Sequence, residues 1–236
     1  MKLRELYSCL KEHKSSGFAE REVYGITHDS RKVKEGYLFV AIRGYKVDGH
    51  DYVIRAIEKG ATALVVDKKI ETVSSIPQIV VPDTRYALAA MSTRFYGEPS
   101  SQMTVVGVTG TNGKTTTSYL TKSIIEASGS EAGLIGTIQY QIGKMVIPAQ
   151  ETTPESVEIQ RYLAEMLKSG IKYAVIEASS HALSQHRVEG VRFSSAIFTN
   201  LSVEHLDYHA NIQNYRAEKL KLVKGLDTEA FAILNA

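Results

Sequence analysis

The stretch VVGVTGTNGKTTTSYL, residues 105–120, decides the fold that this sequence predicts. Its opening valines are β-branched and apolar, which is typical of a buried strand. Gly110 and Gly113 follow, and glycine lets the backbone turn sharply and approach a ligand closely. Residues 115–128 then predict a helix, whose N-terminus would direct backbone N–H groups at an anion, so the stretch predicts a phosphate-binding loop. The expected apolar face of this helix consists of Leu120, Ile124, Ile125 and Ala127.

The loop departs from two common nucleotide-binding patterns. The pattern G-x-x-x-x-G-K-[ST] requires glycine at position 108, where this chain has Val108, and the dinucleotide pattern G-x-G-x-x-G does not fit glycines spaced by three. Lys114 is nevertheless placed to meet the β- and γ-phosphates, and the Thr115 hydroxyl occurs where such loops hold Mg²⁺. A glycine turn beside an incidental lysine is the alternative, and the complete T-G-T-N-G-K-T-T sequence after a valine strand disfavours it.

The composition sets broad limits on the protein. The chain has 236 residues, of which 43% are hydrophobic, enough for one large or two modest domains with a core. A net charge of +2 gives no support for nucleic-acid binding. The single cysteine, Cys9, rules out an internal disulfide framework, and no apolar run approaches membrane-spanning length. We therefore expect a cytoplasmic monomer with no nucleic-acid or membrane partner.

The order of the expected elements predicts an α/β fold in two units. Residues 1–97 form a small α/β unit, and the turn-rich segment GEPSS at residues 97–101 marks its boundary. From residue 98 onward strands and helices alternate, which predicts a parallel sheet with helices on its faces. The expected strands are 37–42, 61–66, 77–82, 172–179 and 194–200, and the expected further helices are 51–60, 84–97, 152–170 and 215–225.

The helix expected at residues 152–170 carries signals at both ends. Thr153 is the expected N-cap, Pro154 takes the first helical position, and Gly170 ends the helix. Such strong end signals make this the best-defined helix of the second unit.

Polar residues end the strands of the second unit. Glu177 lies near the end of one apolar strand, and Asn200 ends the next. Because ligands bind beyond the C-terminal ends of strands in open parallel sheets, residues 110–115, 177–181 and 200–205 should converge on one rim. An ionised carboxylate there costs free energy unless a cation or hydrogen-bond donors meet it, so Glu177 is the expected Mg²⁺ ligand.

Four of the seven histidines fall between residues 181 and 209. The spacing of His205 and His209 puts both on one face of a helix, which would also suit zinc. No cysteine lies nearby, and a phosphate loop requires a hard cation, so Mg²⁺ is favoured. Taken alone, either histidine is equally well explained as a solvated or helix-capping residue.

Several motifs in a fixed order give the chain a resemblance to a known family. T-G-T-N-G-K-T-T, T-T-P-E, E-A-S-S-H, T-N-L-x-x-E-H-L-D-Y-H and Y-x-A-E-K follow one another, and together they resemble the Mur ligases of peptidoglycan synthesis. The segment ITHDSRKVKEGYLFVAIRGYKVDGHDY at residues 26–52 resembles the branch that adds meso-diaminopimelate or lysine to UDP-MurNAc-L-Ala-D-Glu. The resemblance covers essentially the whole chain. One departure is Glu204, where relatives usually carry aspartate, and the carboxylate is retained.

The resemblance implies roles for individual residues. The implied ATP-binding residues are Gly110, Thr111, Asn112, Gly113, Lys114, Thr115 and Thr116. The implied substrate contacts are Asp29, Ser30, Arg31, Tyr45, Lys46 and Val47 for the uridine nucleotide, and Thr152, Thr153, Ser179, Gln185 and Arg187 for the muramoyl-peptide. The implied catalytic residues are Lys114, Glu177, His205 and Lys219, and the implied metal ligands are Thr115, Glu177, His205 and a carbamylated Lys219.

The implied reaction is ATP-dependent amide formation with Mg²⁺. The carboxylate of the glutamate attacks the γ-phosphate of ATP, and the amine of the diamino acid then attacks the resulting acyl phosphate. Carbamylation of Lys219 fits this chemistry, because a neutral amine that captures CO₂ becomes an anionic oxygen ligand.

Members of this family are much longer than this chain, which implies an N-terminal fragment. The segment AFAILNA, residues 230–236, looks like a strand cut short, so the ATP-binding unit is expected to be incomplete and the isolated chain inactive. Two other functions remain open, namely a non-catalytic UDP-MurNAc-peptide-binding module and a ligase similar to folylpolyglutamate synthases. The choice between diaminopimelate and lysine also remains open.

Overall fold

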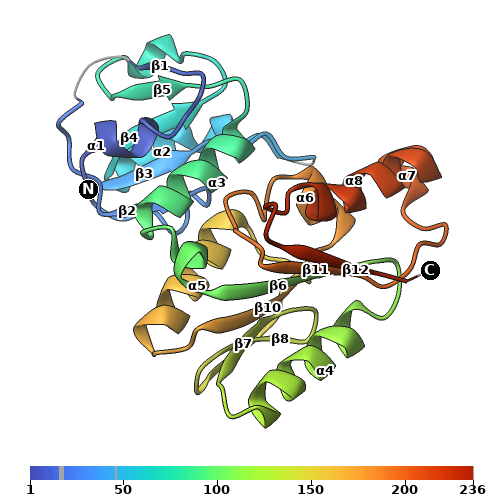
Figure 1. The fold of residues 1–236 in the computed structure, drawn as a ribbon. Coiled ribbons are helices and arrows are strands. Elements are labelled where there is room, and N and C mark those ends of the chain that lie inside the picture. Colours follow the sequence, from blue (N-terminus) through green and yellow to red (C-terminus); the bar gives the residue numbers. More distant parts are fainter. Residues whose placement is uncertain (16–18, 46, 236) are drawn as a thin grey trace. The chain divides into compact units, whose positions relative to one another are not determined.

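The computed structural model describes residues 1–15, 19–45 and 47–235 (Figure 1). Backbone contacts divide it into two compact units, Met1–Gly97 and Glu98–Ala236. Each unit combines one sheet with helices, so the α/β class predicted from the sequence is confirmed. Lys46, one of the predicted uridine contacts, lies outside the described residues. None of the helices in the described ranges is both long and apolar enough to span a lipid bilayer.

A five-stranded sheet forms the first unit, with strand order β1-β5-β4-β3-β2. Strands β2 to β5 run parallel, and β1 joins the edge antiparallel to β5. The core places Phe39 and Leu64 of the sheet against Val53 of α2. The strands are β1 (Lys14–Ser15), β2 (Gly25–Thr27), β3 (Tyr37–Val40), β4 (Ala61–Val66) and β5 (Gln78–Val80). The helices are α1 (Leu3–Tyr7), α2 (Val53–Glu58) and α3 (Thr84–Phe95), with 3-10 turns η1 (Gly49–Tyr52) and η2 (Glu71–Val73).

A seven-stranded sheet forms the second unit, with strand order β12-β11-β6-β10-β7-β8-β9. Strands β12, β11, β6, β10 and β7 run parallel, so their C-terminal ends share one edge (Figure 1). The strands are β6 (Thr104–Thr109), β7 (Ala132–Ile135), β8 (Gln139–Ile142), β9 (Met145–Pro148), β10 (Tyr173–Glu177), β11 (Ser195–Phe198) and β12 (Phe231–Leu234). The helices are α4 (Lys114–Ala127), α5 (Ser156–Lys168), α6 (Ser180–Ser184), α7 (Leu206–His209) and α8 (Ile212–Lys224), preceded by the 3-10 turn η3 (Pro99–Gln102).

Strand β6 is buried on both faces, which explains its run of valines. Val106 and Val108 pack on one face with Ile125 of α4. Val105 faces the opposite side, in the core to which Leu163 of α5 and a leucine of α8 also contribute. Because successive side chains of a strand point to opposite faces, a central parallel strand needs apolar residues at every position.

The structure corrects three details of the sequence-based prediction. Strands β8 and β9 pair antiparallel beyond β7, so the sheet is mixed rather than wholly parallel. The N-cap of α5 is Glu155 and not Thr153, whose hydroxyl donates to the backbone oxygen of Glu177 at 2.6 Å. On α4, Leu120 and Ile124 are 59% and 70% exposed. The buried side of α4 instead carries the small, fully buried Ser118, a residue that hydrophobicity alone does not single out.

We expect Leu163→Ala to lower the free energy of unfolding by about 2–5 kcal/mol, because it removes a fully buried side chain and leaves a cavity. Leu120→Ala is the matched control, since it removes the same atoms from an exposed position on α4, and its effect should stay within about 0.5 kcal/mol. Urea unfolding followed by far-ultraviolet circular dichroism measures both variants. Equal losses in the two variants would contradict the burial pattern described above.

Candidate active site

The phosphate loop, residues 110–115, connects β6 to α4 at the shared edge of the sheet. Gly110 has a φ of 143° and Gly113 a φ of 82°, backbone conformations that favour glycine. A Cβ atom on Gly110 would lie 1.9 Å from the Thr199 Oγ1 atom, so no larger residue fits there. The loop delivers Lys114 as the first residue of α4, where backbone N–H groups and the positive end of the helix dipole suit an anion.

The segment that follows β11 braces this loop. The Asn200 side chain accepts a hydrogen bond from the backbone N–H of Asn112 at 2.9 Å and donates to its carbonyl oxygen at 3.0 Å. The Thr199 hydroxyl donates to the same carbonyl oxygen at 2.6 Å. The Thr111 hydroxyl accepts from the backbone N–H of Ser202 at 2.9 Å. The ends of β6 and β11 are therefore joined by direct hydrogen bonds, which fix the loop before any ligand binds.

Two lysines meet at one carbonyl oxygen of the loop. Lys114 Nζ donates to the Gly110 oxygen at 3.0 Å and to the Thr111 oxygen at 2.8 Å, and Lys219 Nζ donates to the Gly110 oxygen at 2.7 Å. Lys219 is 1% exposed and its Nζ atom lies 4.6 Å from the centre of the Tyr215 ring. Burial, with a further contribution from Lys114, lowers the pKa of Lys219 to about 7. Burial also lowers the pKa of Lys114.

Glu177 ends β10 with a fully buried carboxylate. Its Oε2 atom accepts hydrogen bonds from the Thr115 hydroxyl at 3.0 Å and from the Thr137 hydroxyl at 2.9 Å. Its Oε1 atom accepts one from the Thr137 backbone N–H at 3.2 Å. All three donors are neutral, so the negative charge is hydrogen-bonded but not neutralised by them.

This donor set fits a hard cation. A buried carboxylate beside the Thr115 hydroxyl offers oxygen ligands, which Mg²⁺ prefers. Of the four predicted metal ligands, Thr115 and Glu177 are in direct contact, Lys219 donates to the Gly110 oxygen, and His205 Nε2 lies 3.7 Å from Glu204 Oε2. Among the described residues, no three histidine, cysteine, aspartate or glutamate side chains are placed to hold a metal ion.

His205 lies in a cluster of aromatic side chains. The centre of the His181 ring lies 4.9 Å from that of His205, 4.2 Å from that of Tyr208 and 5.6 Å from that of His209. His205 occupies the N-cap position of α7 without a capping hydrogen bond from its side chain. His209 Nε2 lies 3.0 Å from the Ser180 hydroxyl oxygen. Burial lowers the pKa of both His181 and His209, which favours the neutral form of these two imidazoles.

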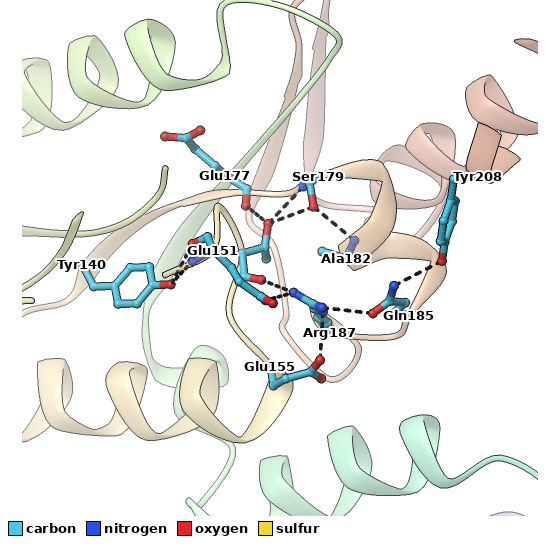
Figure 2. Close-up of polar contacts among 10 residues, drawn as sticks. Tyr140, Glu151, Glu155, Glu177, Ser179, Ala182, Gln185, Arg187 and Tyr208 are labelled. Carbon is cyan, nitrogen blue, oxygen red and sulfur yellow. Dashed lines mark hydrogen bonds and ion pairs between the residues drawn. The ribbon is translucent and has the colours of Figure 1, made fainter. Parts of the chain in front are cut away.

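The predicted muramoyl-peptide contacts form a separate network around Arg187 (Figure 2). The guanidinium donates to the Thr153 carbonyl oxygen at 2.8 Å and to Gln185 Oε1 at 3.1 Å. It also pairs with the carboxylates of Glu151 and Glu155. Thr153 and Ser179 anchor the other end of the network at the backbone of Glu177, and the Glu177 carboxylate points away from them (Figure 2). Arg187 therefore already has two carboxylate partners.

The predicted uridine contacts lie in two loops of the first unit. The Asp29 carboxylate accepts hydrogen bonds from the Arg31 backbone N–H and guanidinium at 2.9 Å, and this arginine lowers the pKa of Asp29 to about 2. Ser30 is buried between them. Tyr45 and Val47 are 79% and 52% exposed in the next loop. The first loop is thus fixed, whereas the second presents apolar side chains to solvent.

Sequence reasoning missed Thr137 and Tyr208. Thr137 follows β7 and contacts Glu177, and Tyr208 accepts a hydrogen bond from Gln185 Nε2 at 3.3 Å. The signal available for Thr137 was its place at the C-terminal end of a parallel strand, the same signal that singled out Glu177. Tyr208 lies inside the T-N-L-x-x-E-H-L-D-Y-H motif, whose histidines were interpreted as possible metal ligands while the tyrosine was not considered.

A sheet of parallel strands, a glycine loop leading into α4 and a buried carboxylate at the end of β10 define a phosphate-binding α/β protein. The chain belongs to the Mur ligase family, since the Mur ligase middle domain matches residues 108–236 and the Mur ligase family catalytic domain matches residues 22–96.

Similar proteins carry the name UDP-N-acetylmuramoyl-L-alanyl-D-glutamate--2,6-diaminopimelate ligase. The one from Caldanaerobacter subterraneus subsp. tengcongensis is 44% identical over 224 residues, which cover 95% of this chain and 46% of the relative. The one from Syntrophomonas wolfei subsp. wolfei is 44% identical over 237 residues, covering 100% and 48%. A solved structure of that name superposes with a TM-score of 0.82 at 24% identity, covering 99% of this chain and 52% of the other, and supports the fold. The chain spans about half the length of the curated relatives it matches.

The lowered pKa of Lys219 predicts a pH-dependent contribution to stability. Between about pH 7 and the usual lysine value of 10.5, the unfolded chain holds a proton that the folded chain lacks, so the free energy of unfolding should rise with pH. Lys219→Met removes this contribution, and the difference between wild type and variant should change by up to about 1.4 kcal/mol per pH unit in that window. Urea unfolding at pH 7 and 9 in CO₂-free buffer measures this difference.

Lys221→Met, on the more exposed side of the same helix, is the control and should keep the wild-type profile. Parallel pH profiles of wild type and Lys219→Met would contradict the assignment.

Proposed function

We propose that the chain carries the nucleotide-binding and substrate-binding parts of an ATP-dependent ligase that joins 2,6-diaminopimelate to UDP-N-acetylmuramoyl-L-alanyl-D-glutamate through an acyl phosphate. The observation that carries the proposal is 44% identity across 95–100% of the chain to ligases of that name. The phosphate loop beside a buried carboxylate supports it independently. The proposal places the reaction in the cytoplasm, where ATP is available.

The phosphate loop and the two lysines bind and orient the nucleotide in this proposal. Bound ATP with Mg²⁺ supplies the phosphoryl group and a cation that offsets its charge. The N-terminus of α4, which starts at Lys114, directs backbone N–H groups at the phosphates, and the Lys114 side chain adds a positive charge next to them. Thr115 and Glu177 supply the oxygen ligands for the cation. Positioning and charge stabilisation of this kind account for most catalysis of phosphoryl transfer.

Lys219 is the proposed site of carbamylation. A pKa of about 7 leaves a large share of the amine neutral near pH 7, and only the neutral amine attacks CO₂. Formation of the N–C bond releases one proton and leaves an anionic carbamate. The product would place oxygen ligands beside Gly110, at the position where Lys219 Nζ now donates to the loop. His205 is the further ligand in this proposal.

Each unit carries predicted substrate contacts in this proposal. The loops that carry Asp29, Arg31 and Tyr45 bind the uridine nucleotide, with Ser30, Lys46 and Val47 beside them. Arg187 binds a carboxylate of the muramoyl-peptide, and Gln185 orients its guanidinium. Thr152, Thr153 and Ser179 line the path between Arg187 and Glu177.

Calorimetric titration and an ADP-release assay test the proposal. We expect the chain to bind UDP-MurNAc-L-Ala-D-Glu and Mg²⁺–ADP, and a full-length ligase that contains it to release ADP in a manner that depends on diaminopimelate and not on L-lysine. Binding of the UDP-substrate without ADP release would favour a binding module. Binding of a folate in place of the UDP-substrate would overturn the proposal.

In a full-length ligase that contains this chain, we expect Lys114→Ala to lower ATP turnover by about 100-fold or more, because it removes a charge contact to the transferring phosphoryl group. Binding of the UDP-substrate should change little, since Lys114 contacts only the phosphate loop. Lys122→Ala is the matched control, because Lys122 lies on the same helix and pairs with Glu126. Full turnover by Lys114→Ala would show that this lysine is incidental.

In a full-length ligase that contains this chain, we expect Lys219→Ala to lose activity and to regain part of it in sodium acetate or formate, since a small carboxylate can take the place of the carbamate. Sodium chloride at equal ionic strength is the control and should restore nothing. A fully active Lys219→Arg variant would contradict carbamylation, because a guanidinium does not capture CO₂.

A further inference from the structure

Thr137 supplies most of the hydrogen bonds that hold the buried Glu177 carboxylate. Its hydroxyl lies 2.9 Å from Oε2, and its backbone N–H lies 3.2 Å from Oε1, so one residue contacts both oxygens of the carboxylate. Thr115 provides the third donor at 3.0 Å. A carboxylate with no exposed surface depends on such donors, because an unsatisfied buried charge is strongly unfavourable.

The backbone before Thr137 is shaped for this contact. A Cβ atom on Gly136 would lie 2.3 Å from Glu177 Oε1 and 2.9 Å from its carboxyl carbon. The absence of a side chain at Gly136 therefore lets the chain pass close enough for the Thr137 N–H to reach the carboxylate. The contact is built by two adjacent residues at the end of β7.

Thr137 also connects two parts of the site that differ in their ligands. Its hydroxyl oxygen lies 3.3 Å from that of Thr115 in the phosphate loop and 3.2 Å from that of Thr152. Thr152 and Thr153, both predicted contacts of the muramoyl-peptide, are called the substrate segment. One hydroxyl thus touches the nucleotide side, the carboxylate and the muramoyl-peptide side. The Thr137 hydroxyl has a single proton to donate. A rotation that directs this proton to one of the three partners therefore changes the hydrogen bonds with the other two.

We propose that Thr137 is a positioning residue that fixes the Glu177 carboxylate and couples binding at the phosphate loop to binding at the substrate segment. The inference rests on the proposed function, in which the Thr115 hydroxyl serves the nucleotide. When the Thr115 hydroxyl contacts the nucleotide instead of Glu177, the hydroxyl and the backbone N–H of Thr137 are the donors that still hold the Glu177 carboxylate. Residues that orient a ligand-binding carboxylate in this way typically change metal affinity or activity 10–100-fold when removed.

The test compares Thr137→Val, which keeps the shape and the backbone N–H, with Thr137→Ser, which keeps the hydroxyl. Calorimetry measures the Kd of UDP-MurNAc-L-Ala-D-Glu with and without saturating Mg²⁺–ADP. In wild type we expect the nucleotide to change this Kd about 5-fold or more, a typical coupling between sites. In Thr137→Val we expect the ratio to fall to about 1, while the Kd without nucleotide stays within about 3-fold of wild type.

The Mg²⁺ concentration for half-maximal ADP binding should rise at least about 10-fold in Thr137→Val and return toward wild type in Thr137→Ser. Thr104→Val, an exposed threonine at the start of β6, is the matched control and should match wild type in every measurement. Unfolding midpoints show whether each variant folds, and Thr137→Ala, which also lacks the hydroxyl and keeps the backbone N–H, carries the comparison if Thr137→Val does not fold. Wild-type coupling and Mg²⁺ dependence in Thr137→Val would overturn the inference. A wild-type chain that binds neither ligand would instead refute the proposed function itself.

Discussion

The second unit depends on the carbonyl oxygen of Gly110, which accepts hydrogen bonds from two lysine ammonium groups. Two like charges within reach of one atom repel each other, and burial raises the cost of both. The fold meets this cost by lowering the pKa of Lys219 to about 7 and by leaving the loop open to an anion. Gly110 has a φ of 143° and lies against Thr199, and its carbonyl oxygen lies 3.0 Å from Lys114 Nζ and 2.7 Å from Lys219 Nζ.

The buried Glu177 carboxylate is the counterpart of these lysines. It lies at the end of the neighbouring strand β10, and it attracts Lys114 electrostatically without a direct hydrogen bond to it. Neutral hydroxyls hold the carboxylate, and backbone carbonyls hold the lysines, so positive and negative charges face one rim without cancelling. Such an arrangement suits a ligand that carries both signs, as a metal-bound phosphate does.

The sequence was most informative where a residue type has one physical use. The valine strand, the glycine loop and the carboxylate at a strand end were predictable, because buried parallel strands and left-handed turns admit few residues. Thr153 was misread as a helix cap, since a threonine before a proline fits that role locally while its actual partner, Glu177, is distant in sequence. Leu120 and Ile124 were wrongly predicted to face the core for a similar reason. The loop before α4 determines which side of the helix packs on the sheet, and the apolar pattern of the helix alone does not show this. Thr137 was missed although it follows a parallel strand, because its contacts with Thr152 and Glu177 are brought together only by tertiary structure.

Arg187 is already paired with Glu151 and Glu155, and this saturation has a consequence for selectivity. A carboxylate that arrives at Arg187 exchanges with one that is present, so the number of ion pairs stays the same. The free energy of binding is then the difference between two similar arginine–carboxylate ion pairs, so their electrostatic attraction largely cancels. What remains is fit, meaning the angle, reach and hydrogen-bonding of the incoming group. In the proposed function, Arg187 would therefore discriminate among anions by shape and would hold stray anions of the medium weakly.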